Sequence, residues 1–541
     1  MKKRNLFMLA FAALAFAACS NDDIVSQEGG DGSITNPTGE AWMSLSIQTP
    51  SSVAGRGLHN PDKENGTSAE SLVSSLRVLF FDDDATDPKF VGEKVFASMA
   101  EAGNPGQPSG GVSQSFKVPE GAKRILIVAN PGPGFPTTIT PGTAYSAVNT
   151  AITETSVKTN LAASGKFMMS NAKGRLEPSL ADGTDTDLAL YSTADAASQH
   201  PLSIHIDRVV AKVRVYVTEA SDVATVDLEG WTLNVTNTKY FPVSERTLTW
   251  NENPANTGAR GTCITPYDLY KIGSYRVDPN YGNSNSPQAL ADYTVVTADP
   301  TAWTASGSAE YCLENTQVAA DNLYKYTTQV LLKAKFVPKQ YQKPDGTYSA
   351  TQDADGWIMI NNAGNAAEYG YFTFATLMEW IEAELNLKYA PGTPDPAGVA
   401  TPITDEYNAY LAALGITPIT LPTASGTSVS TLMTSFNATI ITVKTKADRA
   451  QTVGNFTYYL GGYSYYRIMI KHDDTNAATN ELGEFGVVRN SVYDINVTKF
   501  NNPGYPTIPE PGDEPDEEDK AWLAVQIDVN PWTWYTQTEE F

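Results

Sequence analysis

Short apolar segments that alternate with polar residues recur along most of the chain. Near the amino terminus, Met43, Leu45 and Ile47 alternate with serines, which is the period-two pattern of a β-strand with one buried face. Residues 123–130 (KRILIVAN) are instead continuously apolar, as in a strand buried on both faces. Clusters of Gly, Pro, Asn and Asp separate these segments. We predict further strands at residues 75–82, 165–171, 231–236, 328–338, 464–471 and 491–500.

The apolar positions of residues 202–217 alternate imperfectly with polar ones, so this segment fits either two strands or one bulged strand. Helical spacing is rare. It occurs in residues 374–387, where apolar residues at 377, 378, 381 and 385 share a face and Glu379, Glu382 and Glu384 lie off it. Residues 405–414 are a shorter helical candidate. The pattern therefore predicts a mainly β protein of β-sandwich domains, with a short helical insertion whose apolar faces pack on the β domain.

The amino terminus has the layout of a secretory signal. Three basic residues precede the apolar run at residues 6–18, which is too short to span a membrane. Small residues just before Cys19 resemble a lipoprotein signal, in which cleavage between Ala18 and Cys19 leaves the cysteine as the lipidated first residue. An ordinary signal peptide is the alternative. The acidic run at residues 20–23 resembles a surface-export signal, or is a solvated tether.

A protease-sensitive loop follows the first strand closely. Residues 50–60 are rich in Pro, Ser and Gly, and Arg56 stands between Gly55 and Gly57. Such an arginine is an easy substrate for an arginine-specific protease. It is the only arginine between Arg4 and Arg77, and Arg77 lies within a predicted strand. We predict cleavage between Arg56 and Gly57.

Composition narrows the function further. The chain has 541 residues, enough for two or three domains, with 37 Lys and Arg against 61 Asp and Glu. A net charge of −24 argues against nucleic acid as a partner, because binding phosphates requires clustered basic residues. Besides Cys19, only Cys263 and Cys312 remain; they could form a disulfide or be buried free thiols.

No recognisable catalytic or metal-binding pattern is present. The four histidines are not at metal-ligand spacing, and the Asp-rich runs at residues 82–84 and 182–187 lack the calcium-loop pattern. A glycosidase pair of carboxylates cannot be identified from sequence alone. We expect no enzyme activity, no cofactor and no metal.

The carboxyl terminus combines a linker with a strongly apolar strand. Residues 501–520 are Pro, Gly and acidic residues that cannot form a core of their own. In the following strand Leu523, Val525, Ile527 and Val529 face one way, and beyond Pro531 the pattern resumes with Trp532 and Trp534. Such a strand needs a groove to cover it. It is either donated to another molecule or folded back as the last strand of its own domain.

Several stretches together resemble the major fimbrial subunits of Bacteroidetes, the Mfa-type fimbrilins of type V pili. The resemblance is dispersed over nearly the whole chain, except the helical region at residues 374–414. It rests on residues 42–47 (WMSLSI), 206–213 (IDRVVAKV), 329–335 (QVLLKAK), 485–493 (FGVVRNSVY) and 529–532 (VNPW).

This resemblance implies two tandem transthyretin-like β-sandwich domains, the second with the helical insertion. The expected division is a signal peptide at residues 1–18, a propeptide at 19–56, domains at 57–204 and 205–500, and the linker and polymerisation strand at 501–541. It implies a precursor that is a palmitate-bearing outer membrane lipoprotein and a mature form in cell-surface fimbriae.

The resemblance also implies polymerisation by donor-strand exchange. Loss of residues 19–56 would remove Met43, Leu45 and Ile47 and open a groove for the tail of another copy. The implied partners are copies of itself, anchor and tip subunits, an arginine-specific surface protease, and host or bacterial surface ligands bound in adhesion and biofilm formation. A tip adhesin or a surface glycan-binding lipoprotein are the alternatives.

Overall fold

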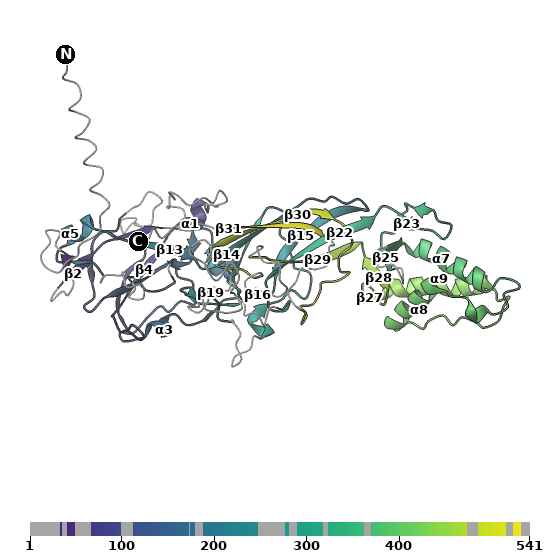
Figure 1. Cartoon of the computed structure of the whole chain (residues 1–541), viewed down its shortest axis with the longest axis horizontal. Coiled ribbons are helices and arrows are strands. Elements are labelled where there is room, and N and C mark those ends of the chain that lie inside the picture. The colour runs from purple at the N-terminus through teal and green to yellow at the C-terminus, as the bar shows by residue number, and fades with distance from the viewer. Residues whose placement is uncertain are drawn as a thin grey trace, which may run out of the picture.

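The molecule is elongated, with two β units in tandem and a helical group at one end (Figure 1). The computed structural model describes residues 33–34, 40–48, 66–98, 112–172, 174–178, 188–246, 276–280, 289–316, 323–361, 369–472, 485–514 and 523–531. The mainly β fold expected from the sequence is confirmed. None of the helices in these ranges has the length and apolar character needed to cross a bilayer.

The first unit is built from two sheets around one core. Met43 and Phe116 of the smaller sheet, and Leu79 and Ile127 of the larger, belong to the same buried cluster. The larger sheet has the order β3 (Leu45–Gln48), β13 (Leu202–Arg208), β11 (Met169–Asn171), β7 (Arg124–Ala129), β4 (Leu76–Phe81) and β5 (Phe90–Phe96). The smaller has the order β1 (Ser33–Ile34), β12 (Leu190–Tyr191), β2 (Ala41–Met43) and β6 (Phe116–Val118).

The second unit repeats this plan. Val213 and Ile495 of one sheet and Leu332 and Tyr466 of the other share a second core. One sheet has the order β21 (Ala309–Leu313), β14 (Val210–Val217), β30 (Ser491–Phe500) and β31 (Leu523–Pro531). The other has the order β15 (Ala224–Asn234), β22 (Gln329–Pro338) and β29 (Tyr463–Met469).

A further sheet separates the second core from the helices. Its order is β26 (Tyr369–Phe372), β25 (Gly356–Asn361), β28 (Phe456–Leu460) and β27 (Thr452–Val453). Trp357 and Tyr459 point into the second core, whereas their neighbours Ile358 and Tyr458 point into a third core formed with the helices. Because successive side chains of a strand point to opposite faces, both faces of this sheet are buried.

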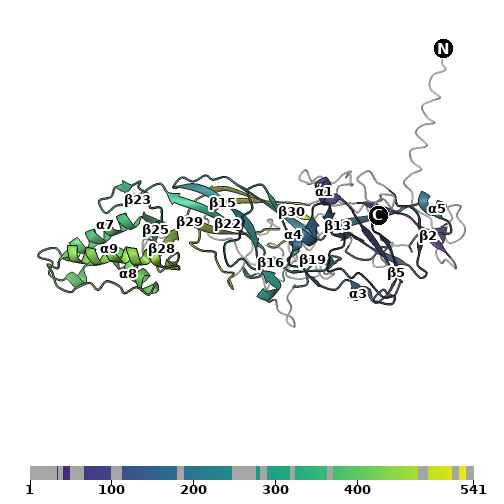
Figure 2. The same cartoon turned by 180° about the vertical axis from the view of Figure 1, so that it is seen from behind.

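Three helices cover the outer face of that sheet: α7 (Phe374–Lys388), α8 (Pro402–Ala413) and α9 (Val429–Thr445). Both views place them together beyond β25 and β28 (Figures 1 and 2). Leu377, Ile381 and Leu385 of α7 are buried at helical spacing, as expected. The sequence prediction included α7 and α8 but missed α9. The insertion is therefore a subdomain with its own core.

Glu384 departs from the expectation that it lies off the buried face. Its carboxylate accepts hydrogen bonds from the backbone N–H groups of Ile403 and Thr404, both at 2.9 Å. These are among the N–H groups at the start of α8 that lack a partner within the helix, so a buried carboxylate is stabilised there.

The remaining elements are short. The helical turns are α1 (Ser68–Ser71), α3 (Tyr145–Val148), α4 (Val157–Asn160), α5 (Ala194–Gln199), and the 3₁₀ turns Leu290–Asp292 and Pro396–Gly398. The small paired strands are β8 (Ile152–Thr153) with β17 (Lys239–Tyr240), β9 (Ala162–Ala163) with β10 (Lys166–Phe167), β16 (Thr236–Asn237) with β20 (Tyr293–Thr294), β18 (Glu245–Arg246) with β19 (Arg276–Val277), and β23 (Tyr341–Gln342) with β24 (Tyr348–Ser349).

The chain passes from the first unit to the second at Val209. Residues 202–217 form two strands and not one bulged strand. β13 pairs with β3 and β11 in the first unit, and β14 pairs with β21 and β30 in the second. The change of sheet falls a few residues beyond the boundary expected between residues 204 and 205, because β13 continues through His205 to Arg208.

Candidate assembly site

Residues 41–48, predicted from the sequence as the first strand and called so below, form β2 and β3 and belong to both sheets of the first unit. Ala41–Met43 pairs with β6 and β12, and Leu45–Gln48 runs parallel to β13. Ser44 forms the corner between them: its carbonyl accepts the N–H of Leu202 at 2.9 Å, and its Oγ donates to the carbonyl of Ala197 at 2.5 Å. Ser44 is 1% exposed, so its side chain is enclosed at this corner.

The inward side chains of this strand are completely enclosed. Met43 is 1% exposed, and Leu45 and Ile47 are 0% exposed. Ser113 binds the edge of β3 that does not face β13. Its N–H donates to the Leu45 carbonyl at 2.7 Å, and its Oγ accepts the Leu45 N–H at 2.8 Å. The residues predicted as the displaced strand are therefore a deeply buried part of the first core.

The carboxyl-terminal strand β31 lies at the edge of a sheet in the second unit. It runs antiparallel to β30, with Val525 opposite Val497 and Ile527 opposite Ile495. Leu523 packs against the second core, but Val525 is 39% exposed. Of the two alternatives for the tail, this structure has the folded-back strand.

Part of the predicted linker is attached to the second unit. Tyr505 exchanges backbone hydrogen bonds with Tyr465 of β29 at 2.7 and 2.8 Å, and the Tyr459 hydroxyl donates to the Gly504 carbonyl at 2.9 Å. A Cβ at Gly504 would lie 2.1 Å from the Tyr465 carbonyl oxygen, so this close approach requires glycine. Farther on, the Glu514 carbonyl accepts the N–H of Tyr324 at 3.1 Å. Residues 501–514 are thus an ordered strap rather than a free tether.

A buried ionic cluster joins the two units. Glu70 of the first unit bonds Lys212 of the second at 2.9 Å, and the Tyr311 hydroxyl donates to Glu70 at 2.9 Å. Burial opposes ionisation of Glu70, but hydrogen bonds from Lys212 and the Thr67 backbone outweigh it and leave its pKa below the ordinary value. Arg208 donates to the Glu70 carbonyl at 2.9 Å and to Asn490 at 3.2 Å.

This cluster is where two of the sequence motifs meet, because Arg208 and Lys212 belong to the motif at residues 206–213 and Asn490 to that at 485–493. Asn490 has a positive φ of 56°, a conformation that asparagine tolerates better than most residues. Sequence reasoning singled out the two motifs but not their contact.

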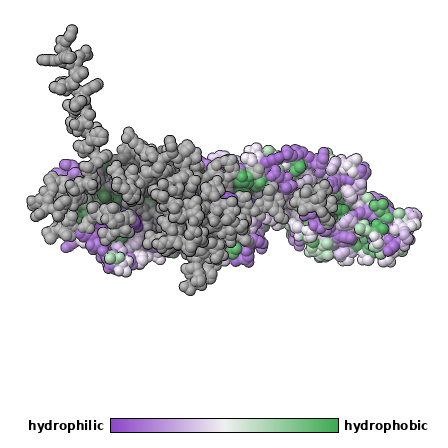
Figure 3. Space-filling model, viewed as in Figure 1, coloured by the Kyte–Doolittle hydropathy of each residue, from purple (hydrophilic) through white to green (hydrophobic). Residues whose placement is uncertain are grey.

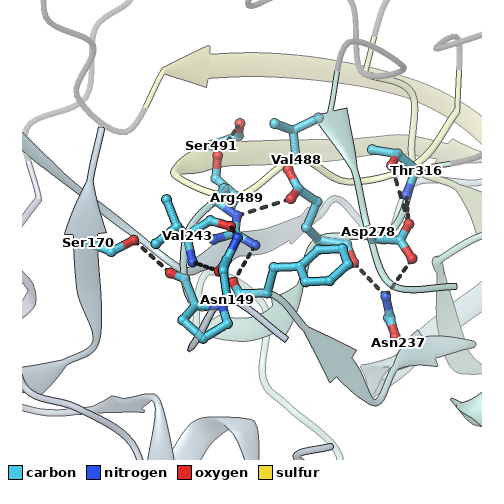
Figure 4. A network of polar contacts seen from close by, with 12 residues as sticks. Asn149, Ser170, Asn237, Val243, Asp278, Thr316, Val488, Arg489 and Ser491 are labelled. Carbon is cyan, nitrogen blue, oxygen red and sulfur yellow. Dashed lines mark hydrogen bonds and ion pairs between the residues drawn. The ribbon is translucent and has the colours of Figure 1, made fainter. Parts of the chain in front are cut away.

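A second polar network lies alongside (Figure 4). Arg489 bonds Glu314 at 3.0 Å, with side chains 2% and 1% exposed, and also donates to the Phe241 carbonyl. From the first unit, Asn149 exchanges hydrogen bonds with the backbone of Val243. Ser170 donates to the Pro242 carbonyl at 2.7 Å. Together these contacts fix the loop at residues 241–243 between the two units.

Asp278 occupies the far side of the network in Figure 4. Burial raises the pKa of its carboxyl to about 7, although hydrogen bonds from the backbones of Thr316 and Asn280 oppose the rise. The amide of Asn237 is a further donor, at 3.1 Å. In the described ranges, no group of three His, Cys, Asp or Glu residues is placed to hold a metal ion.

Of the two cysteines predicted to pair or to be free, the structure describes Cys312. Cys312 is a buried free thiol whose pKa burial raises to about 12. Its predicted alternative partner, Cys263, lies outside the described residues. So do Ala18, Cys19, Arg56, Gly57, Trp532 and Trp534.

Two family models match the sequence. Residues 43–205 match the model described as major fimbrial subunit protein (FimA). Residues 457–538 match the model described as major fimbrial subunit protein type IV, fimbrillin, C-terminal. The first begins within the buried first strand and the second includes β31. No curated protein sequence matches the chain.

Solved structures with a similar course of the chain include a fimbrilin from Porphyromonas gingivalis W83. It is 14% identical, with 92% of this chain and 98% of that chain covered and a TM-score of 0.38. The tip fimbrial protein Mfa3 from Porphyromonas gingivalis, with a C-terminal truncation, is 12% identical, with 91% and 100% covered and a TM-score of 0.35.

Proposed function

Since the chain is related to the Bacteroidetes major fimbrial subunits, we propose that it is a structural shaft subunit of a cell-surface fimbria, assembled by strand exchange. The observation that carries this proposal is the first strand. It fills the core of the first unit, yet in the sequence it precedes the glycine-flanked Arg56 by only a few residues.

The proposed precursor is an outer membrane lipoprotein with its acyl chains on Cys19. An arginine-specific protease then cuts between Arg56 and Gly57. This cut releases the lipid anchor and the first strand in one piece, because residues 19–56 include both.

Release of the first strand would leave a groove in the first unit. Met43, Leu45 and Ile47 would no longer fill the core between the two sheets. Burying three such side chains contributes about 1.5–3 kcal/mol each, on the order of 5–9 kcal/mol in total, before the cost of ordering a new strand. A groove of this kind is filled by an extended segment of another molecule.

The tail is suited to fill it. Strand β31 lies at the edge of its sheet and holds Val525 partly in solvent, so leaving this position costs less than leaving a core. The donor residues of the proposal are Leu523, Val525, Ile527, Val529, Trp532 and Trp534. The partner in each joint is a second copy of the chain, with anchor and tip subunits at the filament ends.

The role proposed is structural rather than enzymatic. The buried charged residues at the junction bind one another, as in the pairs Glu70–Lys212 and Arg489–Glu314. Oppositely charged side chains that pair with one another inside the protein are typical of groups that fix structure.

A tip adhesin, or a surface lipoprotein that binds glycans, is the second candidate. It is favoured by the helical subdomain, which has its own core and ends the long axis (Figure 1). Apolar residues appear among hydrophilic ones on this end (Figure 3), and Leu387 and Ile441 are more than two-thirds exposed, at 71% and 73%. For both candidate functions, we propose that this end of the molecule supports adhesion and biofilm formation.

The amino-terminal residue of protein sheared from cells tests the proposal. Mass spectrometry should find filament subunits that begin at Gly57 and carry no lipid. Filament subunits that still begin at acylated Cys19 would refute the processing step, and a monomeric surface protein with that start would favour the glycan-binding lipoprotein.

A further inference from the structure

The first strand and the tail have matching sequences. Residues 41–48 read AWMSLSIQ and residues 521–528 read AWLAVQID. Both begin with Ala-Trp, then alternate apolar residues with small or polar ones, and both have isoleucine at the seventh position. Building on strand exchange as proposed above, we propose that the tail replaces the first strand of the next subunit in the same direction and residue for residue. Leu523, Val525 and Ile527 then take the places of Met43, Leu45 and Ile47.

The corner at Ser44 selects this register. Ser44 is 1% exposed between the two sheets, so its replacement must be small. In the proposed register the replacement is Ala524. A shift of two residues in one direction puts Gln526 there, and a shift in the other direction puts Trp522 there; neither fits the enclosed position.

Odd shifts are excluded for a different reason. A shift of one residue turns every side chain of a strand to the opposite face. It would place polar residues such as Gln526 and Asp528 in the fully enclosed positions of Leu45 and Ile47. Burying these groups without partners is strongly unfavourable.

The proposed direction differs from the pairing of the tail in its own subunit. In the groove, the tail would run parallel to β13, as β3 does. At rest, β31 runs antiparallel to β30. The residues opposite each tail position therefore change completely on assembly: Gln526 lies opposite Asn496 at rest, and would lie opposite Ser203 of the next subunit, because Ser46 now occupies that position.

Disulfide cross-linking of the full-length chain tests register and direction together. Ser203→Cys and Gln526→Cys are combined in a Cys263→Ser background; Ser203 is exposed, so its replacement should not disturb folding. After arginine-specific cleavage and polymerisation, non-reducing electrophoresis should show a ladder of covalent multimers. The uncleaved precursor should show none. The pair His205→Cys with Asp528→Cys should also link, because both pairs align only if the strands are parallel.

Matched controls separate the possible failures. Ser203→Cys with Ala524→Cys, or with Asp528→Cys, reports a register shifted by two residues and should not form a ladder. If one of these pairs links and Ser203→Cys with Gln526→Cys does not, the register is wrong although strand exchange stands. A ladder from Ser203→Cys with Gln526→Cys but none from His205→Cys with Asp528→Cys overturns the parallel direction.

A final pair reports the resting position. Asn496→Cys with Gln526→Cys should form a disulfide within one subunit of the precursor and lose it in filaments. If filaments form while this link persists in every subunit and no pair gives a ladder, strand exchange by the tail is itself refuted.

Discussion

The strands at the two ends of the chain have the same alternating pattern but very different surroundings. The first strand crosses both sheets of its unit, and Met43, Leu45 and Ile47 are at most 1% exposed. The last strand lies at the edge of one sheet, where Val525 is 39% exposed. The same alternating pattern is therefore buried to different extents, and the position of the strand in its sheet decides how much. A tail moved from the edge into the groove would gain buried apolar area, which favours assembly.

A carboxylate in each strand should give the largest effect and the clearest contrast. Ile47→Asp places an unpaired charge in a fully buried position, so the precursor should lose several kcal/mol of stability and fail to fold. Ile527→Asp lies on an edge strand and should leave the precursor folded but unable to form filaments. Thermal unfolding and electron microscopy measure the two outcomes. Ile47→Val and Ile527→Val are the conservative controls, and equal loss of stability in both Asp variants would remove the contrast.

Deletion of residues 521–541 should abolish assembly at little cost to the subunit. Because β31 is an edge strand and the strap at residues 501–514 has its own contacts with β29 and Tyr324, the truncated chain should remain a soluble monomer with a slightly lower Tm. Protease should still cut it at Arg56. Normal filaments from this chain, or its outright unfolding, would show that the tail is a structural strand of its own domain.

Enlarging Ala524 should slow assembly by a smaller factor. Ala524→Leu brings a bulky side chain to the corner where Ser44 now lies, whereas Ala524→Ser reproduces the residue of the first strand. We expect slower polymerisation of the Leu variant and near-normal polymerisation of the Ser variant, followed by light scattering after protease treatment. Equal rates for the two variants would argue against a tight corner.

The smallest expected effect is a pH dependence of the stability of the second unit, in which the tail rests. The folded-state pKa of Asp278 is raised to about 7, so the folded chain holds this proton more tightly than the unfolded chain, where the value is near the usual 3.8. Its contribution to stability is complete below the unfolded pKa and is lost as the pH rises through the folded one. Denaturant unfolding between pH 4 and 8 should show this decline, and Asp278→Asn should reduce it. An unchanged pH profile in the variant would assign the decline to other groups.

Much of the β structure could be predicted because alternation is a local signal. The predicted strand at residues 491–500 coincides with β30, and the burial of Met43, Leu45 and Ile47 follows from their spacing. Helix α9 was missed because its many Thr, Val and Ile residues favour strands. The useful signal was the spacing of Leu432, Phe436 and Val443, which are buried in the third core.

The contacts that hold distant segments together could not be predicted. Glu70 meets Lys212 and Arg489 meets Glu314 only after the sheets have formed, and neither pair has a sequence spacing that suggests contact. The strap is held largely by backbone groups and tyrosine hydroxyls, which leave no pattern beyond the glycine at position 504. The sequence also could not show whether the tail pairs within its own domain or with another molecule, because an edge strand and a strand in a groove have the same alternating pattern.

Val209 is the only residue between β13 of the first unit and β14 of the second. The connection leaves no slack, and the Glu70–Lys212 pair and Arg208 brace the same junction from within. The two units should therefore tilt together as one stiff body. In a rod made of such subunits, bending would concentrate at the joints between neighbours.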